Sequence, residues 1–245
     1  SRLRRTIEAT LAAHEAVGAP PTWVLSNHDV ARHVSRYARP QGTRPVHSLQ
    51  DLLAQPKDLD LGLRRARAAT LLMLALPGGA YVYQGEELGL EEVEDLPDEL
   101  LQDPTWQRSE HADRGRDGCR VPIPWSGQAP PFGFGPAGST PWLPQPATWR
   151  DKTAEAEAGD PESVLELYRS ALHLRRDHAA LGDGSLSWLD SPADVLSFTR
   201  DPGFGCLVNL SASDVPLPAG ARVLLASGPV DRAVPSDTAV WLSYD

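Results

Sequence analysis

The chain has 245 residues, of which 41% are hydrophobic and 23% are charged, a composition that is ordinary for a globular protein able to bury a core. Its formal net charge is −10, and no basic face is available to neutralise phosphates, which argues against nucleic acid and anionic membrane surfaces as partners. The longest apolar run, residues 66–76, is shorter than the ~18 residues of a membrane span and contains Arg67.

The two cysteines, Cys119 and Cys206, match neither a disulfide framework nor a metal-ligand spacing, so we predict free thiols. The histidines show no ligand spacing either, and no metal or other cofactor is expected. The first residues, Ser1 to Arg5, contain neither a Met nor an apolar signal core. We therefore expect the chain to begin inside a longer polypeptide, and the free thiols favour the cytoplasm.

The first elements alternate between helix and strand. Apolar residues recur on one helical stripe over residues 2–17, and a short β-prone run follows at 22–26. Residues 61–76 predict a second helix, and residues 80–83 predict the next strand. Short apolar strands separated by helices indicate an α/β architecture with a parallel sheet covered by helices. Two strands cannot complete such a sheet alone.

A long, irregular stretch comes next. Residues 91–160 are rich in Pro, Gly, Trp and charge with little periodicity, and connections of this length are usually functional or disordered. Asp160 and Pro161 then predict the N-cap and first position of another helix, whose apolar residues continue to Leu174.

From about residue 182 the pattern changes to short alternating segments separated by Asp, Pro, Gly and Ser. The segments are 185–189, 194–199, 205–210, 221–225 and 239–243. They predict a small antiparallel β domain.

The first motif with chemical potential is Asn27-His28-Asp29, directly after the predicted strand. In a (β/α)₈ barrel, residues just past the carboxyl end of a strand face the active site, where a carboxylate and an imidazole can meet a substrate. The alternative is that Asn27 or Asp29 only caps the following turn.

The second motif, Tyr83 to Gly89, also follows a predicted strand and contains the adjacent pair Glu86 and Glu87. The glutamates could bind a hydroxyl or a guanidinium near the rim of a barrel. Neighbouring residues of an extended chain point to opposite sides, so they do not form a convincing acid/base pair, and a structural role in ion pairs is favoured.

The third motif runs from Gly115 to Trp125 and contains Arg116 and Asp117. Arginine supplies a rigid fork suited to a carboxylate or to sugar hydroxyls, and Trp supplies a flat surface for a pyranose ring. A loop held together by Arg–Asp pairs is the alternative, and the residues alone do not decide between them.

In order and spacing, the three motifs resemble the later segments of the oligo-1,6-glucosidase and maltase-type α-glucosidases of the α-amylase family. The segment 141–144 is similar to the family's sequence after the third motif. The resemblance implies that residues 1–181 are the C-terminal part of a (β/α)₈ TIM barrel, with its strands seven and eight. It implies that residues 182–245 are a small antiparallel β-sandwich domain.

The resemblance also implies roles for three residues. Asp29 matches the family's third acidic residue, which holds substrate hydroxyls and stabilises the positively charged sugar of the transition state. His28 matches a hydroxyl-binding histidine, and Arg116 matches an arginine that helps to bind the nonreducing glucose. The sequence departs from the family's pattern at Val121, Ile123 and Pro124, where Thr, Met and Gln are common. We therefore expect the roles implied for the pocket to carry over less closely there, while Arg116 itself is retained.

The implied activity is hydrolysis of terminal α-glucosidic bonds of small oligosaccharides, with release of glucose by a retaining mechanism. That mechanism needs a nucleophile and an acid/base carboxyl about 5–5.5 Å apart. The family's segments for both are not found in this sequence, so we place them upstream of Ser1 in a full-length parent and expect the chain alone to be inactive. A small α-glucoside is the expected partner.

Three alternatives stay open. Trehalose or sucrose isomerase-type transglucosylases of the same family share these segments, and exclusion of water from the pocket would separate them from a hydrolase. A noncatalytic barrel scaffold is a second alternative, against which the intact Asn27-His28-Asp29 and Arg116 argue. An unrelated small α/β protein with a closed sheet is the third.

Overall fold

The computed structural model describes residues 1–40 and 49–244, and the chain divides into two compact units. Unit 1 comprises Ser1–Leu25, Arg67–Tyr81 and Leu167–Asp245, and unit 2 comprises Ser26–Ala66 and Val82–Glu166. Each unit is therefore assembled from separate stretches of the chain. The predicted domain boundary divides the chain at one point, after residue 181, whereas the two units alternate along the chain. The boundary stays a prediction.

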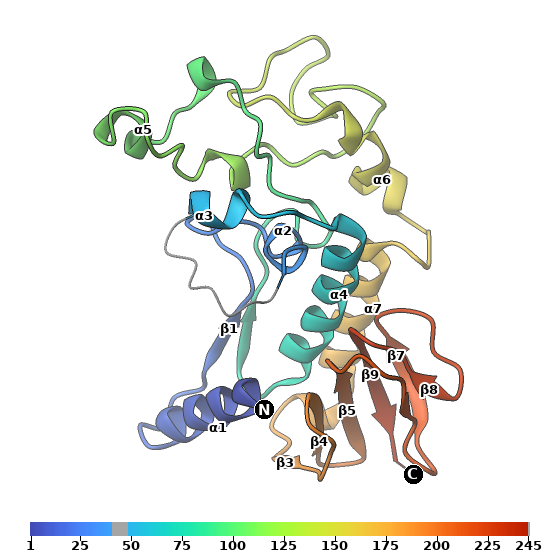
Figure 1. Cartoon of the computed structure of the whole chain (residues 1–245). Helices are drawn as coiled ribbons and strands as arrows, with labels where there is room; N and C mark the ends of the chain where they lie inside the picture. The colour runs from blue at the N-terminus through green and yellow to red at the C-terminus, as the bar shows by residue number, and fades with distance from the viewer. Residues whose placement is uncertain (41–48, 245) are drawn as a thin grey trace. The chain divides into compact units, whose positions relative to one another are not determined.

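Unit 1 begins with helix α1 (Arg2–Glu15), followed by strand β1 (Thr22–Val24) (Figure 1). Strand β2 (Gly79–Tyr81) lies beside β1 in parallel, with Trp23 opposite Ala80. The indole of Trp23 donates to the carbonyl of Pro77 at 2.7 Å, just before β2. The predicted parallel pairing is confirmed, with strands shorter than the runs at 22–26 and 80–83.

Two longer helices connect the parallel strands to the rest of unit 1. Helix α4 (Leu59–Ala75) places its second half in this unit, and helix α7 (Val164–Asp177) places all but its first turn there. A short 3₁₀ turn, η4 (Ala179–Leu181), follows α7. The guanidinium of Arg175 donates to three carbonyls between Leu74 and Gly78, and so fixes α7 to the end of α4.

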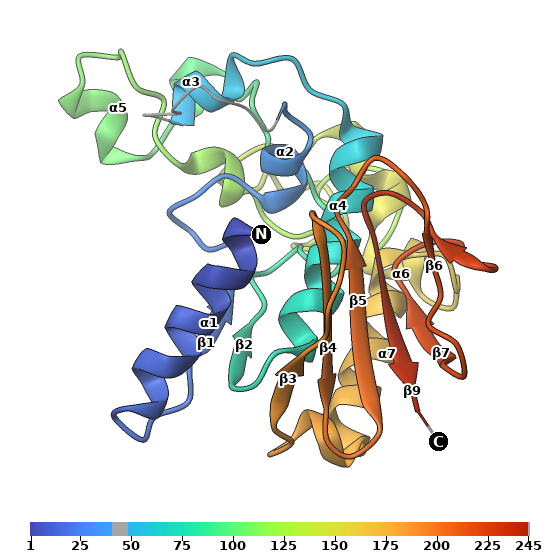
Figure 2. The same ribbon diagram turned by 60° about the horizontal axis from the view of Figure 1, so that its bottom comes forward.

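The C-terminal part of unit 1 is a five-stranded antiparallel sheet, whose strands lie edge to edge in Figure 2. Their spatial order is β3 (Leu186–Trp188), β4 (Val195–Arg200), β5 (Phe204–Asn209), β9 (Thr238–Ser243) and β7 (Arg222–Ala226). All five predicted segments are confirmed as strands. A separate pair, β6 (Val215–Pro216) and β8 (Ala233–Val234), was not predicted, because two residues are too few to show an alternation.

The five-stranded sheet is covered on both faces, which follows from the alternation of side chains along a strand. Leu196 and Phe198 of β4 belong to the main core, which also contains the end of α4 and part of α7. Val195 belongs to a second cluster that contains Val234 of β8. This arrangement is compatible with the expected sandwich, which stays a prediction.

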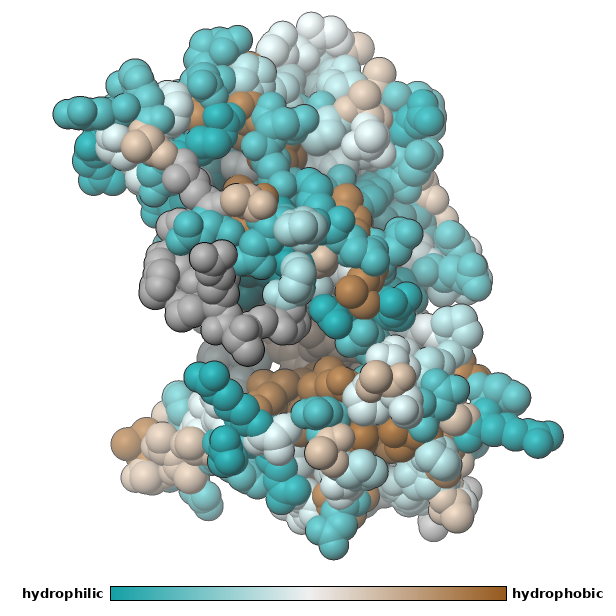
Figure 3. Space-filling view, in the orientation of Figure 1, coloured by the Kyte–Doolittle hydropathy of each residue, from teal (hydrophilic) through white to brown (hydrophobic). Residues whose placement is uncertain are grey.

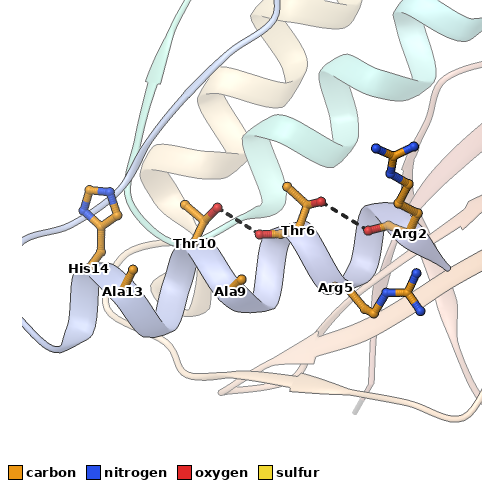
Figure 4. A pocket seen from close by; sticks show the side chains of 7 residues that line it. All are labelled: Arg2, Arg5, Thr6, Ala9, Thr10, Ala13 and His14. Carbon is orange, nitrogen blue, oxygen red and sulfur yellow. Dashed lines mark hydrogen bonds between the residues drawn. The ribbon is translucent and has the colours of Figure 1, made fainter. Parts of the chain in front are cut away.

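Helix α1 has an open outer face. Arg2, Arg5, Thr6, Ala9, Thr10, Ala13 and His14 line a shallow groove there of about 670 Å³ (Figure 4). The hydroxyls of Thr6 and Thr10 donate to carbonyls of their own helix, one turn back. On the face shown in Figure 3, hydrophobic surface is open beside the N-terminal end of α1. Among the helices of the described residues, none is long and apolar enough to cross a membrane.

Unit 2 consists of irregular chain and short helical turns. These are α2 (His33–Tyr37), α3 (Leu49–Leu53), η1 (Asp98–Leu100), α5 (Pro104–Arg108), η2 (Asp117–Cys119), η3 (Ala147–Lys152) and α6 (Ala154–Glu157). A core of its own contains Leu88, Phe132 and Trp149, all almost fully buried. The stretch 91–160, which shows little periodicity in sequence, is therefore a folded, cored segment.

The start of α7 differs from the prediction. Asp160 does not cap the helix: its carboxylate accepts from the backbone N–H of Glu162 in a turn before the helix begins. The hydroxyl of Ser163 accepts from the N–H of Glu166 at 3.1 Å and donates to the carbonyl of Glu157 at 2.9 Å. Ser163 is therefore the side-chain cap of α7, three residues later than predicted.

Candidate active site

The Asn27-His28-Asp29 segment forms a tight turn at the start of unit 2. The side-chain oxygen of Asn27 accepts from the backbone N–H of Asp29 at 2.7 Å. This is the capping role considered as the simpler alternative for Asn27. It leaves the carboxylate of Asp29 half exposed and free to make contacts of its own.

The carboxylate of Asp29 contacts the other two predicted site residues, His28 and Arg116. One carboxylate oxygen, Oδ1, lies 2.6 Å from Nη1 of Arg116. The other, Oδ2, lies 3.4 Å from Nε2 of His28, whose ring is largely exposed. The structure thus brings Asp29, His28 and Arg116 together within unit 2, although Arg116 is 87 residues away in sequence.

Arg116 is held by a buried carboxylate that the sequence analysis did not single out. Its Nε lies 2.6 Å from Oδ2 of Asp103, and its Nη2 lies 3.3 Å from Oδ1. The backbone N–H of Arg116 also donates to Asp103. These hydrogen bonds hold the pKa of the Asp103 carboxyl well below its ordinary value and raise the pKa of Arg116. The bidentate contact leaves Nη1 as the atom directed at Asp29.

Asp103 gave one local signal in the sequence. It precedes Pro104, and an Asp-Pro pair is typical of a helix N-cap with Pro at the first helical position. The structure confirms that geometry, since Asp103 accepts from the N–H of Thr105 at the start of α5. The same side chain also binds Arg116 through both of its oxygens, which no local pattern predicts.

A second guanidinium, that of Arg120, completes the cluster. Its Nε donates to the carbonyl of His28 at 3.0 Å, and its Nη2 lies 3.5 Å from Oδ1 of Asp29. Its Nη1 lies 3.3 Å from Oδ2 of Asp103. Asp117 lies between the two arginines in sequence and accepts from the backbone N–H of Asp103. Arg120, itself in the third motif, therefore contacts both His28 and Asp29 of the turn.

The geometry of this cluster suits recognition of a polyhydroxylated ligand. Carboxylate acceptors, guanidinium donors and an imidazole converge around the half-exposed Asp29. Such groups offer both halves of the hydrogen bonds that a sugar hydroxyl makes. Among the described residues, the other carboxyls of the cluster do not form a nucleophile and acid/base pair with Asp29, because Asp103 is buried and contacted by both arginines, and Asp117 is buried and accepts from the backbone of Asp103.

Both glutamates of the second motif, Glu86 and Glu87, make contacts within unit 2. Glu86 is almost fully buried, with Oε1 4.0 Å from Nδ1 of His33. Burial lowers the pKa of His33 to about 3, so the ring is neutral and this contact is not a charged pair. Glu87 accepts from the backbone N–H of Gly85 at 2.9 Å. Both contacts lie within unit 2, and the structural role in ion pairs that the sequence favours for the two glutamates stays a prediction.

The positions that depart from the family's pattern have internal roles as well. Val121 and Ile123 are buried in the core of unit 2, and the carbonyl of Pro124 accepts from the N–H of Ala154. Trp125 keeps half of its surface exposed. Cys119 and Cys206 are free, as predicted, and both are buried.

The family model "Alpha amylase, catalytic domain" matches residues 2–184 of this chain. A probable alpha-glucosidase of Rhizobium meliloti is 36% identical over 192 residues, which cover 77% of this chain and 31% of that protein. The oligo-1,6-glucosidase of Parageobacillus thermoglucosidasius is 28% identical over 200 residues, which cover 73% of this chain and 31% of that protein. The chain thus spans less than a third of the length of these relatives.

Solved structures align over almost the whole chain. The alpha-glucosyl transfer enzyme XgtA is 31% identical, with a TM-score of 0.73 over 98% of this chain and 43% of XgtA. A mutant of the trehalulose synthase MutB is 25% identical, with a TM-score of 0.72 over 98% of this chain and 46% of MutB. The fold is accordingly that of α-amylase-family TIM-barrel enzymes, with an antiparallel sheet, while the assignment of β1 and β2 as strands seven and eight stays a prediction. The chain belongs to the α-amylase family.

Proposed function

We propose that this chain is the C-terminal part of an enzyme that hydrolyses terminal α-glucosidic bonds of small oligosaccharides and releases glucose. The observation that carries the proposal is the contact between Asp29 and Arg116, 2.6 Å apart in a chain of this family. It joins the two motifs whose residues would touch the sugar. The names of the curated relatives, alpha-glucosidase and oligo-1,6-glucosidase, support the same activity.

Each site residue has a proposed role. Asp29 accepts hydrogen bonds from hydroxyls of the bound glucose and stabilises the positive charge that develops on the sugar ring. His28 binds a hydroxyl beside it, and Arg116 binds the nonreducing glucose while it holds the Asp29 carboxylate in place. The nucleophile and the acid/base carboxyl of the retaining mechanism belong to the part of the full-length enzyme outside this chain.

Transfer of the glucosyl group to another sugar is the second candidate function. The similarity to XgtA, an alpha-glucosyl transfer enzyme, and to a trehalulose synthase favours it. The two reactions share the glycosyl-enzyme intermediate and differ in whether water or a sugar hydroxyl attacks it. The products formed from sucrose or maltose therefore distinguish them. A scaffold role is disfavoured, because a scaffold needs no cluster of sugar-binding groups.

The test is glucose release from maltose, isomaltose and sucrose by the full-length enzyme and by its Asp29→Asn variant. The substitution keeps the size of the side chain but removes the charge, so we expect kcat to fall roughly 100-fold or more while the protein stays folded. Asp151→Asn is the matched control, because the Asp151 side chain is exposed and contacts only the adjacent Arg150 among the described residues.

The outcomes separate the candidates. Release of glucose by wild type and by Asp151→Asn, with loss in Asp29→Asn, supports the hydrolase, and the preferred sugar identifies the linkage. Rearranged disaccharides in place of glucose support the transglucosylase. If the Asp29→Asn enzyme kept the wild-type kcat, the proposed role of Asp29 in stabilising the transition state would be wrong.

A further inference from the structure

Arg32 is a buried arginine that the proposed reaction does not use directly. Its side chain is almost fully buried, and its guanidinium binds two backbone carbonyls: Nη1 donates to Gln84 at 2.7 Å and Nη2 donates to Cys119 at 2.9 Å. Its backbone N–H donates to the carboxylate of Glu92 at 2.9 Å. Burying a guanidinium is costly, and hydrogen bonds to it compensate only if their geometry is well defined.

The two carbonyls belong to different motifs. Gln84 is in the second motif, and Cys119 is at the end of η2 in the third motif, while Arg32 itself is three residues after Asp29. Tyr83 reinforces the junction: its hydroxyl donates to the same Cys119 carbonyl at 3.0 Å, and the Arg32 guanidinium lies 5.4 Å from the centre of its ring. The Arg32 side chain thus connects the second and third motifs, and its backbone lies three residues after the first.

The approach of Arg32 to the second motif depends on a glycine. Gly85 has a φ of +84°, and a Cβ at that position would lie 2.7 Å from Nη1 of Arg32. The backbone of the Tyr83 to Gly89 segment therefore passes the guanidinium at a distance that only glycine allows. The junction is a close-fitting arrangement and not a loose surface contact.

The junction controls the turn that carries both arginines of the site. Cys119 lies directly before Arg120, and its N–H donates to the carbonyl of Arg116 at 3.3 Å. A shift of the Cys119 carbonyl would consequently move the backbone from which both guanidiniums reach Asp29. Arg32 anchors one end of that turn and, through its own backbone, the loop that carries Asp29.

We propose that Arg32 is a positioning residue that holds the Arg116–Arg120 turn against Asp29. It touches no substrate, and it acts by fixing the distance between groups that do. The proposal rests on the proposed function, since the role of Arg32 is defined by the reaction that Asp29 and Arg116 serve. A lysine at this position keeps the charge but has one nitrogen in place of Nη1 and Nη2, so it cannot reproduce the fixed geometry of the two separate hydrogen bonds.

The first experiment compares Arg32→Lys with Arg39→Lys in the full-length enzyme. Arg39 is equally buried in unit 2, and its contacts with described residues are with the carbonyls of Ser35 and Leu53 and with Glu94, none of which belongs to the second or third motif. We expect Arg32→Lys to lower kcat/KM by roughly 10-fold to 100-fold, because misplacement of catalytic groups by about 1 Å has effects of that size. Arg39→Lys should lower the Tm without lowering kcat.

A double-mutant cycle separates positioning from a general loss of stability. If Arg32 acts through Arg116, the effect of Arg32→Lys should shrink to about two-fold or less in an Arg116→Met background, because the contact it supports is already gone. Fully additive effects would overturn the proposal. If Arg32→Lys does not fold, Tyr83→Phe replaces it, since this variant removes the second donor to the Cys119 carbonyl. Its effect on kcat/KM should show the same dependence on Arg116.

A structural readout keeps this proposal distinct from the proposed function. In a crystal structure of Arg32→Lys, the 2.6 Å contact between Arg116 and Asp29 should be lost, whether or not the wild type releases glucose. An inactive wild type combined with a lost contact would contradict the proposed function and support the positioning role. An active wild type whose Arg32→Lys variant keeps both the contact and kcat/KM would contradict the positioning role alone.

Discussion

Glu92 shows how burial at a single residue changes its chemistry. Its carboxyl accepts from the N–H of Arg32, and its own N–H donates to the hydroxyl of Ser35. Burial nevertheless raises its pKa from 4.5 to about 7, since loss of water outweighs the hydrogen bond and the neighbouring charges of Arg32 and Arg39. Glu94 raises it further. Gly118 permits this packing, because a Cβ there would lie 2.5 Å from the carboxylate.

The raised pKa predicts a pH-dependent difference between wild type and Glu92→Gln. The folded state keeps the proton of Glu92 up to about pH 7, whereas the unfolded chain loses it near pH 4.5. The unfolded state therefore binds fewer protons in this window, and the stability of wild type falls relative to Glu92→Gln as the pH rises from 4.5 to 7. Urea unfolding midpoints of both proteins between pH 4 and 8 check this. Parallel curves would mean that Glu92 ionises normally.

At the scale of elements, helix α7 is started by Ser163 and not by the Asp-Pro pair before it. The side chain of Ser163 is buried. Its hydroxyl accepts from the N–H of Glu166 in the helix and donates to the carbonyl of Glu157 before the helix. The carboxylate of Asp160 makes one exposed hydrogen bond. The two side chains should accordingly differ in their contributions to stability.

Replacement of each by alanine tests this difference. We expect Ser163→Ala to lower the free energy of unfolding by about 1–2 kcal/mol, because it removes a cap and one of the two hydrogen bonds to the Glu157 carbonyl, which keeps only the N–H of Asp160. Asp160→Ala should cost about 0.5 kcal/mol or less, since its hydrogen bond is replaced by water. Urea unfolding of the two variants beside wild type measures both values. Equal losses, or a larger loss for Asp160→Ala, would restore Asp160 as the cap.

On the scale of the whole molecule, the parallel part of the fold is incomplete in the described residues. Strands β1 and β2 pair with each other, and within the described residues neither has a further neighbour. Val24 and Tyr81, at their ends, are exposed. A barrel requires closure of its sheet, and open edges and uncovered apolar faces destabilise an isolated segment. The groove on α1 is likewise an open surface in this part of the fold (Figure 4).

The prediction at this scale is that the 245-residue chain alone does not turn over substrate. The reason is chemical, because Asp29 is proposed as a transition-state stabiliser and not as the nucleophile or the acid/base. Glucose release from maltose by a sequence-verified preparation of the 245 residues, beside the full-length enzyme, checks this. Detectable release that is abolished by Asp29→Asn would place a complete catalytic apparatus within the chain.

The sequence by itself determined the elements with strong local patterns and the three motifs. Helix α1, helix α4 and the five strands of the antiparallel sheet were predicted close to their observed bounds, because their apolar periodicities are long enough to be specific. Asp29, His28 and Arg116 were selected through the order of the motifs. The fold of the stretch 91–160 was not predicted, since its short turns bury a core without a regular period.

Only the tertiary structure decided how the motifs are connected. Asp103 supports Arg116 across 13 residues, and Arg32 binds Cys119 across 87 residues. Such pairings depend on where the chain returns in space, and no local preference encodes that. The sequence therefore names the residues that we propose to contact a sugar, and the packing of distant segments determines which buried side chains hold them in place.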